Sequence, residues 1–321
     1  MLKTKTYLKI LFGTLALLFA LAVGYAYYFI EHYPPPFTNR ISLDAKLKYI
    51  RNKIDVNKVD TFIVGSSIGL NNVIGSILEK ESKVVNHAVN LSVYEATTLE
   101  AEQLTKLAKT FPNLKRIIYS AQYSDLPHPW RYENFDAKTY IGFMNHTLSW
   151  WRLLKFYFKA CNNLLFCYER SQKWEREHMQ PDKFTSLLFD HTCSVPLKIY
   201  KQRGVGGRWY LPHPPIMHGE SFRAIARMAK EAQKRGMHFY VAHQPYRPEL
   251  YKKHKSVRDG VAYFDEKVTK AISEYNGTLI KLQNLPLNNS HFADRTHLND
   301  RGSAIGTKAI AQAIDTTEKE K

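Results

Sequence analysis

Two short segments, far apart in the chain, carry side chains that together would suit acyl transfer. The first is Val64-Gly65-Ser66-Ser67, which directly follows a short apolar run. A serine on a tight turn between a strand and a helix stands clear of the sheet, so its hydroxyl can attack a substrate beside backbone amides that stabilise negative charge. The same Gly-Ser-Ser sequence is also a common turn and helix cap, so alone it does not establish a nucleophile.

The second segment is Phe292–Asn299, which contains Asp294 and His297. An Asp and a His three residues apart on a turn allow the carboxylate to accept a hydrogen bond from one imidazole nitrogen. The other nitrogen is then free to take a proton from a serine hydroxyl. The alternative is an Asp turn beside a surface His. Ser67, His297 and Asp294 therefore form a candidate triad if the fold unites the two segments.

Strands and helices alternate along most of the chain. Strand-like runs are predicted at Asp60–Gly65, Val84–Asn86, Arg116–Tyr119, His238–Ala242 and Thr278–Ile280. Helices are predicted at Ile41–Asn57, about Glu95–Lys109, Ser221–Arg235, about Val257–Tyr275 and about Arg301–Ile314. This order predicts an α/β fold whose parallel sheet is covered by helices on both faces. Ligands of such sheets bind beyond the carboxyl ends of the strands, where both candidate segments are expected.

Between about residues 135 and 210 the alternation stops, and the chain becomes rich in aromatic and basic residues such as Trp150-Trp151-Arg152. We predict a mostly helical insertion over the sheet edge or the site. It is either an ordinary packed subdomain or a lid that faces the membrane or covers substrate. Gly204-Val205-Gly206-Gly207 lacks the Lys and Ser/Thr of a P-loop and indicates a flexible turn.

The segment Ile10–Ile30 contains no charged residue and is long enough to cross a bilayer as a helix. Lys3, Lys5 and Lys9 precede it, which favours a cytoplasmic amino terminus and an exported main domain. A cleaved signal peptide is the alternative, although the uncharged run is longer than a usual signal core. The predicted division is a cytoplasmic tail (1–9), a transmembrane anchor (10–30), a spacer and lead-in helix (31–57), and the main domain (58–321).

The composition limits the partners. With 46 Lys and Arg against 29 Asp and Glu, the net charge is +17, which attracts nucleic acid, anionic lipid or acidic polymers. An exported domain does not meet nucleic acid, so that partner is not expected. Cys161, Cys167 and Cys193 are too few and too scattered for a disulfide framework or a zinc site, although one pair could form a disulfide. No metal or cofactor is expected.

A serine after the first strand and an Asp-x-x-His before the last helix, around a parallel sheet, resemble the SGNH (GDSL-like) hydrolase superfamily. The resemblance spans about Asp60 to Ile314 apart from the insertion. It implies a flavodoxin-like fold, with Ser67 as nucleophile, His297 as base and Asp294 as the orienting acid. The anchor, the Gly-Ser-Ser form and the Asp-x-Thr-His-Leu-Asn form look most like membrane-anchored envelope proteins of the DltD and alginate O-acetylation type.

The sequence departs from the superfamily in the blocks that supply the oxyanion hole. Ser66 replaces the Asp of the first block, and the nearest match to the glycine of the second block is Ala88. The third block is absent, and Gln122 stands in its place. The resemblance thus implies an oxyanion hole made by Ser67, Ala88 and Gln122.

Two further residues are candidates for substrate binding. Asn90 follows Ala88 in the second block, and His243 follows a predicted strand, at the expected rim of the site. A purely structural role is the alternative for His243.

These features predict a membrane-anchored serine esterase or O-acyltransferase acting on envelope glycan or lipid. We expect it at the bacterial cell membrane, with the main domain periplasmic or extracellular. Its expected partners are the membrane, an acylated envelope polysaccharide or lipid, and a membrane-bound acyltransferase. The alternative is a catalytically inactive SGNH-like envelope protein that binds anionic polymer or assembles an O-acylation complex.

Overall fold

In the computed structural model, which describes residues 4–201 and 217–320, five strands form one parallel sheet. The strands are β1 (Thr61–Gly65), β2 (Ala88–Asn90), β3 (Arg116–Ala121), β4 (His238–His243) and β5 (Thr278–Lys281). Their order is β2-β1-β3-β4-β5, and each neighbouring pair is parallel. This is the flavodoxin-like doubly wound order. The predicted α/β fold class is confirmed.

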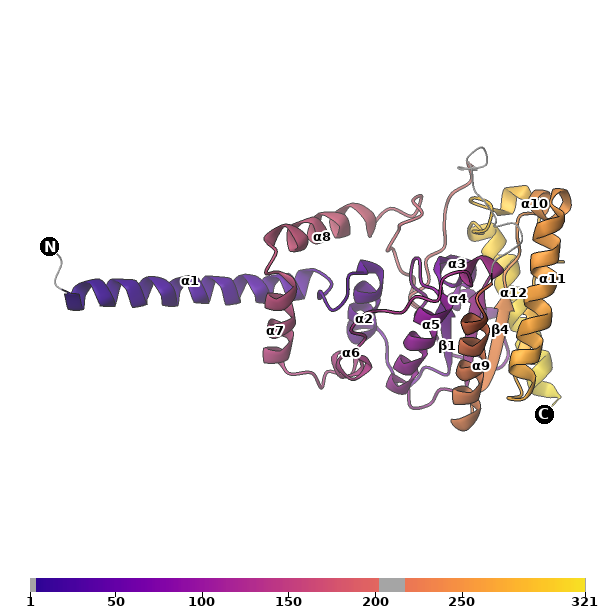
Figure 1. The fold of residues 1–321 in the computed structure, drawn as a ribbon, viewed down its shortest axis with the longest axis horizontal. Coiled ribbons are helices and arrows are strands. Elements are labelled where there is room, and N and C mark those ends of the chain that lie inside the picture. Colours follow the sequence, from indigo (N-terminus) through magenta and orange to yellow (C-terminus); the bar gives the residue numbers. More distant parts are fainter. Residues whose placement is uncertain (1–3, 202–216, 321) are drawn as a thin grey trace.

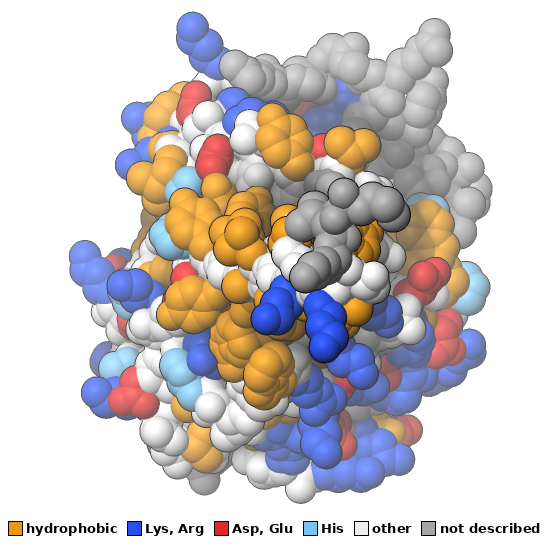
Figure 2. All heavy atoms as spheres, turned by 90° about the vertical axis from the view of Figure 1, so that its left-hand side faces the viewer, with side chains coloured by type: hydrophobic (Ala, Val, Ile, Leu, Met, Phe, Trp, Pro, Cys, Tyr) orange, Lys and Arg blue, Asp and Glu red, His pale blue; other side chains and the backbone are white. Residues whose placement is uncertain are grey.

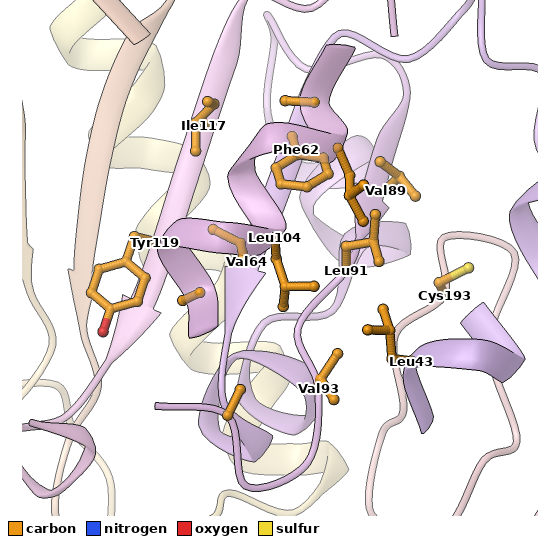
Figure 3. Close-up of a cluster of buried hydrophobic side chains, with 14 of the residues drawn as sticks. Leu43, Phe62, Val64, Val89, Leu91, Val93, Leu104, Ile117, Tyr119 and Cys193 are labelled. Atoms are coloured by element: carbon orange, nitrogen blue, oxygen red, sulfur yellow. The ribbon is translucent and has the colours of Figure 1, made fainter. Parts of the chain in front are cut away.

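Alternate side chains of each strand enter two hydrophobic layers. One layer lies under α5 (Thr98–Thr105), α9 (Gly219–Lys234) and α11 (Lys255–Ser273), and the other lies under α4 (Gly75–Glu81) and α12 (Asp300–Lys319). The first layer, part of which is drawn in Figure 3, contains Phe62, Val64, Ile117, Tyr119, Phe239 and Val241. The second contains Ile63, Ile118, Tyr240, Ala242 and Ile280. Helices on both faces leave the carboxyl edge of the strands as the open place for a site.

Several element boundaries differ from the sequence prediction. The predicted strand Val84–Asn86 is wrong: the amide of Asn86 donates to the Asp60 carboxylate and that of Val85 to the Ser82 hydroxyl, so this segment is a turn. The strand β2 follows it. The predicted helix over Glu95–Lys109 is the α-helix α5 continued by a 3₁₀ turn, Lys106–Thr110.

The other helices agree with the prediction more closely. The lead-in helix is α2 (Ile41–Lys53), which ends where Ile54 becomes extended. The last helix, α12, continues to Lys319 rather than ending near Ile314.

The predicted insertion is helical only in its first part. Its helices are α6 (Ala137–Met144), α7 (Trp150–Ala160) and α8 (Leu164–Glu177), whereas residues 178–201 form neither helix nor strand. A disulfide between Cys161 and Cys167 closes the turn between α7 and α8, and Cys193 is free and buried. The glycines of Gly204-Val205-Gly206-Gly207 lie outside the described residues.

The helix α1 (Thr4–His32) projects from the domain, as Figure 1 shows. By length and composition it can cross a membrane, as could a signal sequence at this position. Only Ala26, Phe29 and Ile30 of α1 are buried. The Phe29 ring lies 5.3 Å from that of Tyr157 in α7, so the carboxyl end of α1 packs on the insertion.

The segment between α1 and α2 is packed rather than a free spacer. Pro34, Pro35 and Pro36 are buried, and the Arg170 guanidinium of α8 contacts the carbonyls of Pro34 and Pro35. Arg170 also forms a buried ion pair with Asp44 of α2. Burial raises the pKa of Asp44 to about 7, even though the charge of Arg170 acts in the opposite direction.

Lys46 of α2 is fully buried and donates to the Asn90 carbonyl of β2 at 2.6 Å. Burial disfavours its charged form and lowers its pKa to about 7. The unfolded chain keeps the ordinary pKa of about 10.5. Between these pH values the unfolded chain therefore holds one more proton than the folded chain, and stability rises with pH.

We predict that replacing Gly65 with Ala destabilises the fold. A Cβ at Gly65 would lie 2.2 Å from the Ser120 carbonyl oxygen of the neighbouring strand, so the backbone must shift. Overpacking of this kind costs about 1–3 kcal/mol, and here the contact is with backbone. Urea unfolding of the full chain in detergent measures the change. Gly219→Ala is the matched control, because its Cβ would meet only an Arg223 nitrogen at 3.9 Å. Equal stability of both variants would contradict the prediction.

We also predict that Lys46 makes stability pH-dependent above neutrality. The wild-type free energy of unfolding should gain up to about 1.4 kcal/mol per pH unit from this group between pH 7 and 10. In Lys46→Met this component disappears, whereas it persists in the control Lys53→Met, which changes an exposed lysine of the same helix. Urea unfolding at several pH values provides the test, and parallel pH profiles for wild type and Lys46→Met would refute the assignment.

Candidate active site

The structure brings together the three side chains that the sequence analysis singled out as a triad. The Ser67 Oγ lies 2.9 Å from His297 Nε2, and His297 Nδ1 lies 2.8 Å from Asp294 Oδ2. The three groups form one continuous hydrogen-bonded chain. They lie at the carboxyl edge of the sheet, beside the point where the strand order reverses between β1 and β3.

Ser67 owes its position to the turn that ends β1. It is the first residue of α3 (Ser67–Asn72), and Ser66 caps this helix by accepting a hydrogen bond from the Ile68 amide at 3.2 Å. The preceding Gly65 lets the chain pass close to β3, as described above. The cap and the glycine together aim the Ser67 side chain out of the sheet.

The loop that carries His297 is a tight turn with its own internal bonds. Phe292 and Leu298 form an antiparallel bridge, and the Ala293 amide donates to the His297 carbonyl at 2.9 Å. Asp294 Oδ1 accepts the amides of Thr296 at 2.8 Å and of His297 at 2.7 Å. One carboxylate therefore holds both the backbone and the ring of His297.

Asn72, which sequence reasoning missed, fastens this loop to the helix that begins with Ser67. It is fully buried at the end of α3. Its amide nitrogen donates to the Thr296 carbonyl at 3.2 Å, and its oxygen accepts the Leu298 amide at 2.9 Å. Both neighbours of His297 are thus tied to the helix that begins with Ser67. The only sequence signal was an Asn-Asn pair closing a short helix, which does not reveal a distant partner.

The electrostatics favour an ionised Asp294. Burial would raise the pKa of its carboxyl, but the charge of His297 and the hydrogen bonds from His297 and Thr296 outweigh burial and hold the pKa below its ordinary value. An ionised carboxylate accepts a hydrogen bond from the Nδ1–H group of the ring. This partner assigns the tautomer that leaves Nε2 as the acceptor of the Ser67 hydroxyl proton.

The triad opens into a cavity of about 480 Å³. Its walls come from the segment before α2, from the loop after β2, and from the insertion. The residues that line it include Ser67, His297, Arg40, Glu95, Lys173, Glu177 and Phe184. Lys173 and Glu177 belong to α8, and the ring of Phe184 stands edge-on to the His297 ring at 5.8 Å. The insertion therefore forms one wall of the site. A second cavity of about 970 Å³ shares Asn39 and Arg40 with the first.

Glu95 stands at the rim in an unusual backbone conformation. Its φ of 60° lies in the left-handed region, which a residue with a Cβ rarely adopts. Arg40 holds this loop by donating to the Tyr94 carbonyl at 3.0 Å and to the Glu95 carboxylate at 3.2 Å. Strain of this kind concentrates at functional sites, and here it presents an exposed carboxylate to the cavity.

The predicted oxyanion donors Ala88 and Gln122 are wrong. Ala88 pairs with Thr61 at the amino-terminal end of β1, away from Ser67, and its amide donates to Glu79 at 2.8 Å. Gln122 lies near the site, but its side-chain amide donates to the carbonyls of Pro245 and Thr296 at 2.7 and 3.4 Å. Gln122 therefore supports the His297 loop instead of facing the cavity.

The predicted substrate contacts Asn90 and His243 are also wrong. Asn90 is fully buried, and its amide donates to the carbonyls of Gly69 and Val73 beneath α3. His243 is only 2% exposed, and its Nδ1 lies 2.6 Å from the Asp265 carboxylate while its ring packs on Phe264. Both side chains support the fold under the site.

Asp125 is a carboxyl near the triad that sequence reasoning missed. It belongs to the 3₁₀ turn after β3, and its Oδ2 accepts the Gln122 amide at 2.9 Å. Burial raises the pKa of Asp125 to about 6, against the opposing effects of the Gln122 amide, the Ser66 hydroxyl and the His297 charge. This carboxyl braces Ser66, the neighbour of the nucleophile.

Within residues 4–201 and 217–320, no group of three or more His, Cys, Asp or Glu side chains is arranged to hold a metal ion. No protein-family model matches the sequence, and a comparison with curated proteins finds no match. Among solved structures, the chain is similar to a carbohydrate esterase family 2 enzyme with a carbohydrate-binding domain from Corynascus thermopiles (Myceliophthora fergusii). The similarity covers 82% of this chain and 67% of that chain, at 9% identity and a TM-score of 0.42.

His297 and His243 each pair with an Asp, so they provide a matched test of the catalytic assignment. We predict that His297→Gln lowers hydrolysis of an activated acetyl ester by about 10³-fold or more, because His297 is the group that the described part of the chain places to accept the Ser67 proton. His243→Gln should keep the activity and lower the free energy of unfolding by about 1–3 kcal/mol, through the weakened bond to Asp265. The rate of ester hydrolysis and the free energy of unfolding in urea, measured for both variants, test this prediction. Equal activity losses would contradict the assignment.

Proposed function

We propose that this protein is a serine esterase or O-acyltransferase with Ser67, His297 and Asp294 as its catalytic triad. The observation that carries the proposal is the hydrogen-bonded chain from Asp294 through His297 to Ser67, which ends at a cavity. A serine held in this way beside an open cavity suits attack on an ester carbonyl.

The reaction has two balanced halves. In the first, Ser67 Oγ attacks the acyl carbonyl while His297 Nε2 takes the hydroxyl proton. The tetrahedral intermediate then expels the leaving alkoxide, which receives that proton, and an acyl-Ser67 ester remains. In the second, water or a sugar hydroxyl gives its proton to His297 and attacks the ester, and Ser67 recovers its proton as the acyl group leaves. Asp294 keeps the ring oriented throughout.

The proposed site offers few hydrogen-bond donors to stabilise the oxyanion. The Ser67 amide lies in the first turn of α3, where backbone amides have no acceptor within the helix. It is the one donor of the predicted set that fits the site. Loss of a single oxyanion donor typically costs about 10²–10³ in rate. We therefore expect slow hydrolysis of simple esters and a dependence on the natural substrate to complete the site.

Membership of the SGNH superfamily is part of the proposal. The flavodoxin-like strand order, a serine directly after β1, and an Asp-x-x-His turn just before α12 support it. The membrane-anchored envelope subgroup is a finer proposal, supported by α1 and its preceding lysines. It places the amino terminus in the cytoplasm and the domain outside the bacterial cell membrane.

The cavity walls favour a polar substrate, such as an acylated envelope glycan or a glycolipid headgroup. Arg40, Glu95, Lys173 and Glu177 place charges of both signs around the triad. The adjoining cavity adds aromatic rings, among them the exposed Trp130, which suit stacking on sugar rings. Transfer to such a glycan would use an acyl donor supplied by a membrane-bound acyltransferase.

A non-catalytic role is the second candidate. The observation that favours it is the commitment of Ala88 and Gln122 to internal hydrogen bonds, which leaves few oxyanion donors. In that case the fold would bind anionic polymer, or assemble an O-acylation complex, through its positively charged surface.

We predict that the full chain, incubated with an activated acetyl ester, acquires an acetyl group on Ser67 that mass spectrometry detects. The Ser67→Ala variant should gain no adduct and lose the esterase activity. The control Ser76→Ala removes a hydroxyl that bonds Asp190, away from the cavity, and should behave like wild type. An added sugar acceptor should speed the loss of the adduct if the enzyme transfers the acyl group.

The non-catalytic alternative gives the opposite result. It predicts no adduct in wild type and undiminished binding of anionic polymer by Ser67→Ala. A wild-type protein that behaves in this way would overturn the enzyme proposal.

A further inference from the structure

We propose that α7 and the disulfide-closed turn after it form a docking surface that lies in the headgroup layer of an anionic phospholipid bilayer. The surface, here called the interfacial surface, comprises Trp151, Lys155, Phe158, Leu165 and Tyr168. The inference rests on the part of the proposed function in which α1 crosses the membrane. It goes further by assigning a second membrane contact to the domain itself.

The interfacial surface is an exposed apolar stripe on a packed helix. Trp151 and Phe158 are 72% and 41% exposed, and Lys155 lies between them along the same side of α7. The opposite side, with Leu153 and Tyr157, is buried against the domain. The rings of Trp151 and Phe158 stand edge-on to those of Trp150 and Tyr157 and still remain exposed. A helix with one exposed side of aromatic and basic residues and one side buried on the domain fits a position in the plane of a membrane surface.

The stripe continues through the turn that the Cys161–Cys167 disulfide closes. Leu165 and Tyr168, at the start of α8, are 67% and 62% exposed. Figure 2 looks along α1 from its amino-terminal end, so the hydrophobic side chains in the middle of this face include those of α1 itself, and Lys and Arg side chains lie beside them. Aromatic and basic side chains together suit the layer of anionic headgroups.

The length of α1 places α7 at the depth of the headgroups. The uncharged run of residues 10–30 gives a helix of about 30 Å, which equals the thickness of a bilayer hydrocarbon core. With Lys9 at one edge of that core, the other edge falls near Tyr27–Ile30. The Tyr27 ring lies 6.2 Å from that of Trp150, the first residue of α7. In Figure 1, α7 also crosses α1 near this end of α1 and runs across its direction.

Docking would set the distance between the membrane and the site. The helix α8 begins at the interfacial surface and ends with Glu177, which lines the cavity of the triad. Its 14 residues span about 21 Å. A site held at this height above the headgroups can receive a substrate that is itself attached to the membrane.

A bilayer is favoured over a protein partner because the interfacial surface is continuous with α1. The interfacial surface adjoins the helix that enters the membrane, at the depth where lipid headgroups surround that helix. The exposed Lys155 of this surface and the neighbouring exposed Lys159 match the charge of an anionic leaflet.

The test measures the depth of a spin label at position 158 in the full chain. Phe158→Cys is labelled in a Cys193→Ala background and reconstituted into vesicles of phosphatidylcholine and phosphatidylglycerol. Phe19→Cys, within α1, and Lys234→Cys, exposed on α9, are the matched labels for the hydrocarbon core and for water. Frequent collisions of a label with oxygen indicate that it lies in the hydrocarbon core, and frequent collisions with a water-soluble nickel chelate indicate that it lies in water.

We expect the label at 158 to be protected from the nickel chelate and accessible to oxygen, between the labels at 19 and 234. Replacing Lys155 and Lys159 with Glu should remove this protection in anionic vesicles, and high salt should weaken it in the unchanged protein. The same charge reversal at Lys230 and Lys234, on α9, should have no effect on the label at 158.

Three outcomes would overturn the inference. A label at 158 that behaves like the one at 234, while the label at 19 reports the core, leaves the anchor intact and removes the interfacial surface. Labels at both 19 and 158 in water show that α1 does not insert. A label at 158 shielded from both reagents shows that protein, not lipid, covers the surface. None of these outcomes affects the acylation of Ser67, which is measured separately.

Discussion

The structure depends on one contact that joins residues 230 positions apart, the hydrogen bond between the Ser67 hydroxyl and the His297 ring. Neither segment can make this contact alone. The parallel sheet brings the end of β1 and the loop before α12 to the same edge, because all its strands point the same way. Asn72 then fixes the distance by binding the backbone on both sides of His297 from the helix that Ser67 begins. A buried amide that satisfies two backbone groups is costly to remove, so the loop has little freedom to separate from Ser67.

Those features that local chemistry determines could be predicted from the sequence. A β-branched run ended by Gly-Ser-Ser specifies a strand and a capped turn, and Asp-x-x-His specifies a carboxylate that reaches its own loop. The oxyanion donors could not be predicted, because they depend on where β2 begins. The segment Val84–Asn86 has the composition of a strand, but the carboxylate of Asp60 and the hydroxyl of Ser82 capture its amides. The strand therefore starts at Ala88, which places that residue at the wrong end of the sheet.

The burial of individual side chains could not be predicted from the sequence either, as His243 and His297 show. Each histidine follows a plausible pattern, and each has a ring nitrogen within 2.8 Å of a carboxylate oxygen. His243 is enclosed by Phe264 and its own strand, whereas His297 meets a serine and a cavity. Chemistry therefore depends on what faces the second ring nitrogen, and this is set by the packing of helices far away in sequence.

The segment between α1 and α2 determines how the site is held relative to α1. Three consecutive prolines are typical of a stiff spacer, but Pro34, Pro35 and Pro36 are buried, and Arg170 contacts the carbonyls of the first two. Arg170 pairs with Asp44, and two residues further along α2 Lys46 binds β2 through the Asn90 carbonyl. Burying such charges is expensive unless each has a close partner. Here the partners connect α8, α2 and the sheet into a single support. The wall of the cavity and the base of α1 are therefore held by the same side chains, and the position of Ser67 relative to α1 follows from packing rather than from a linker.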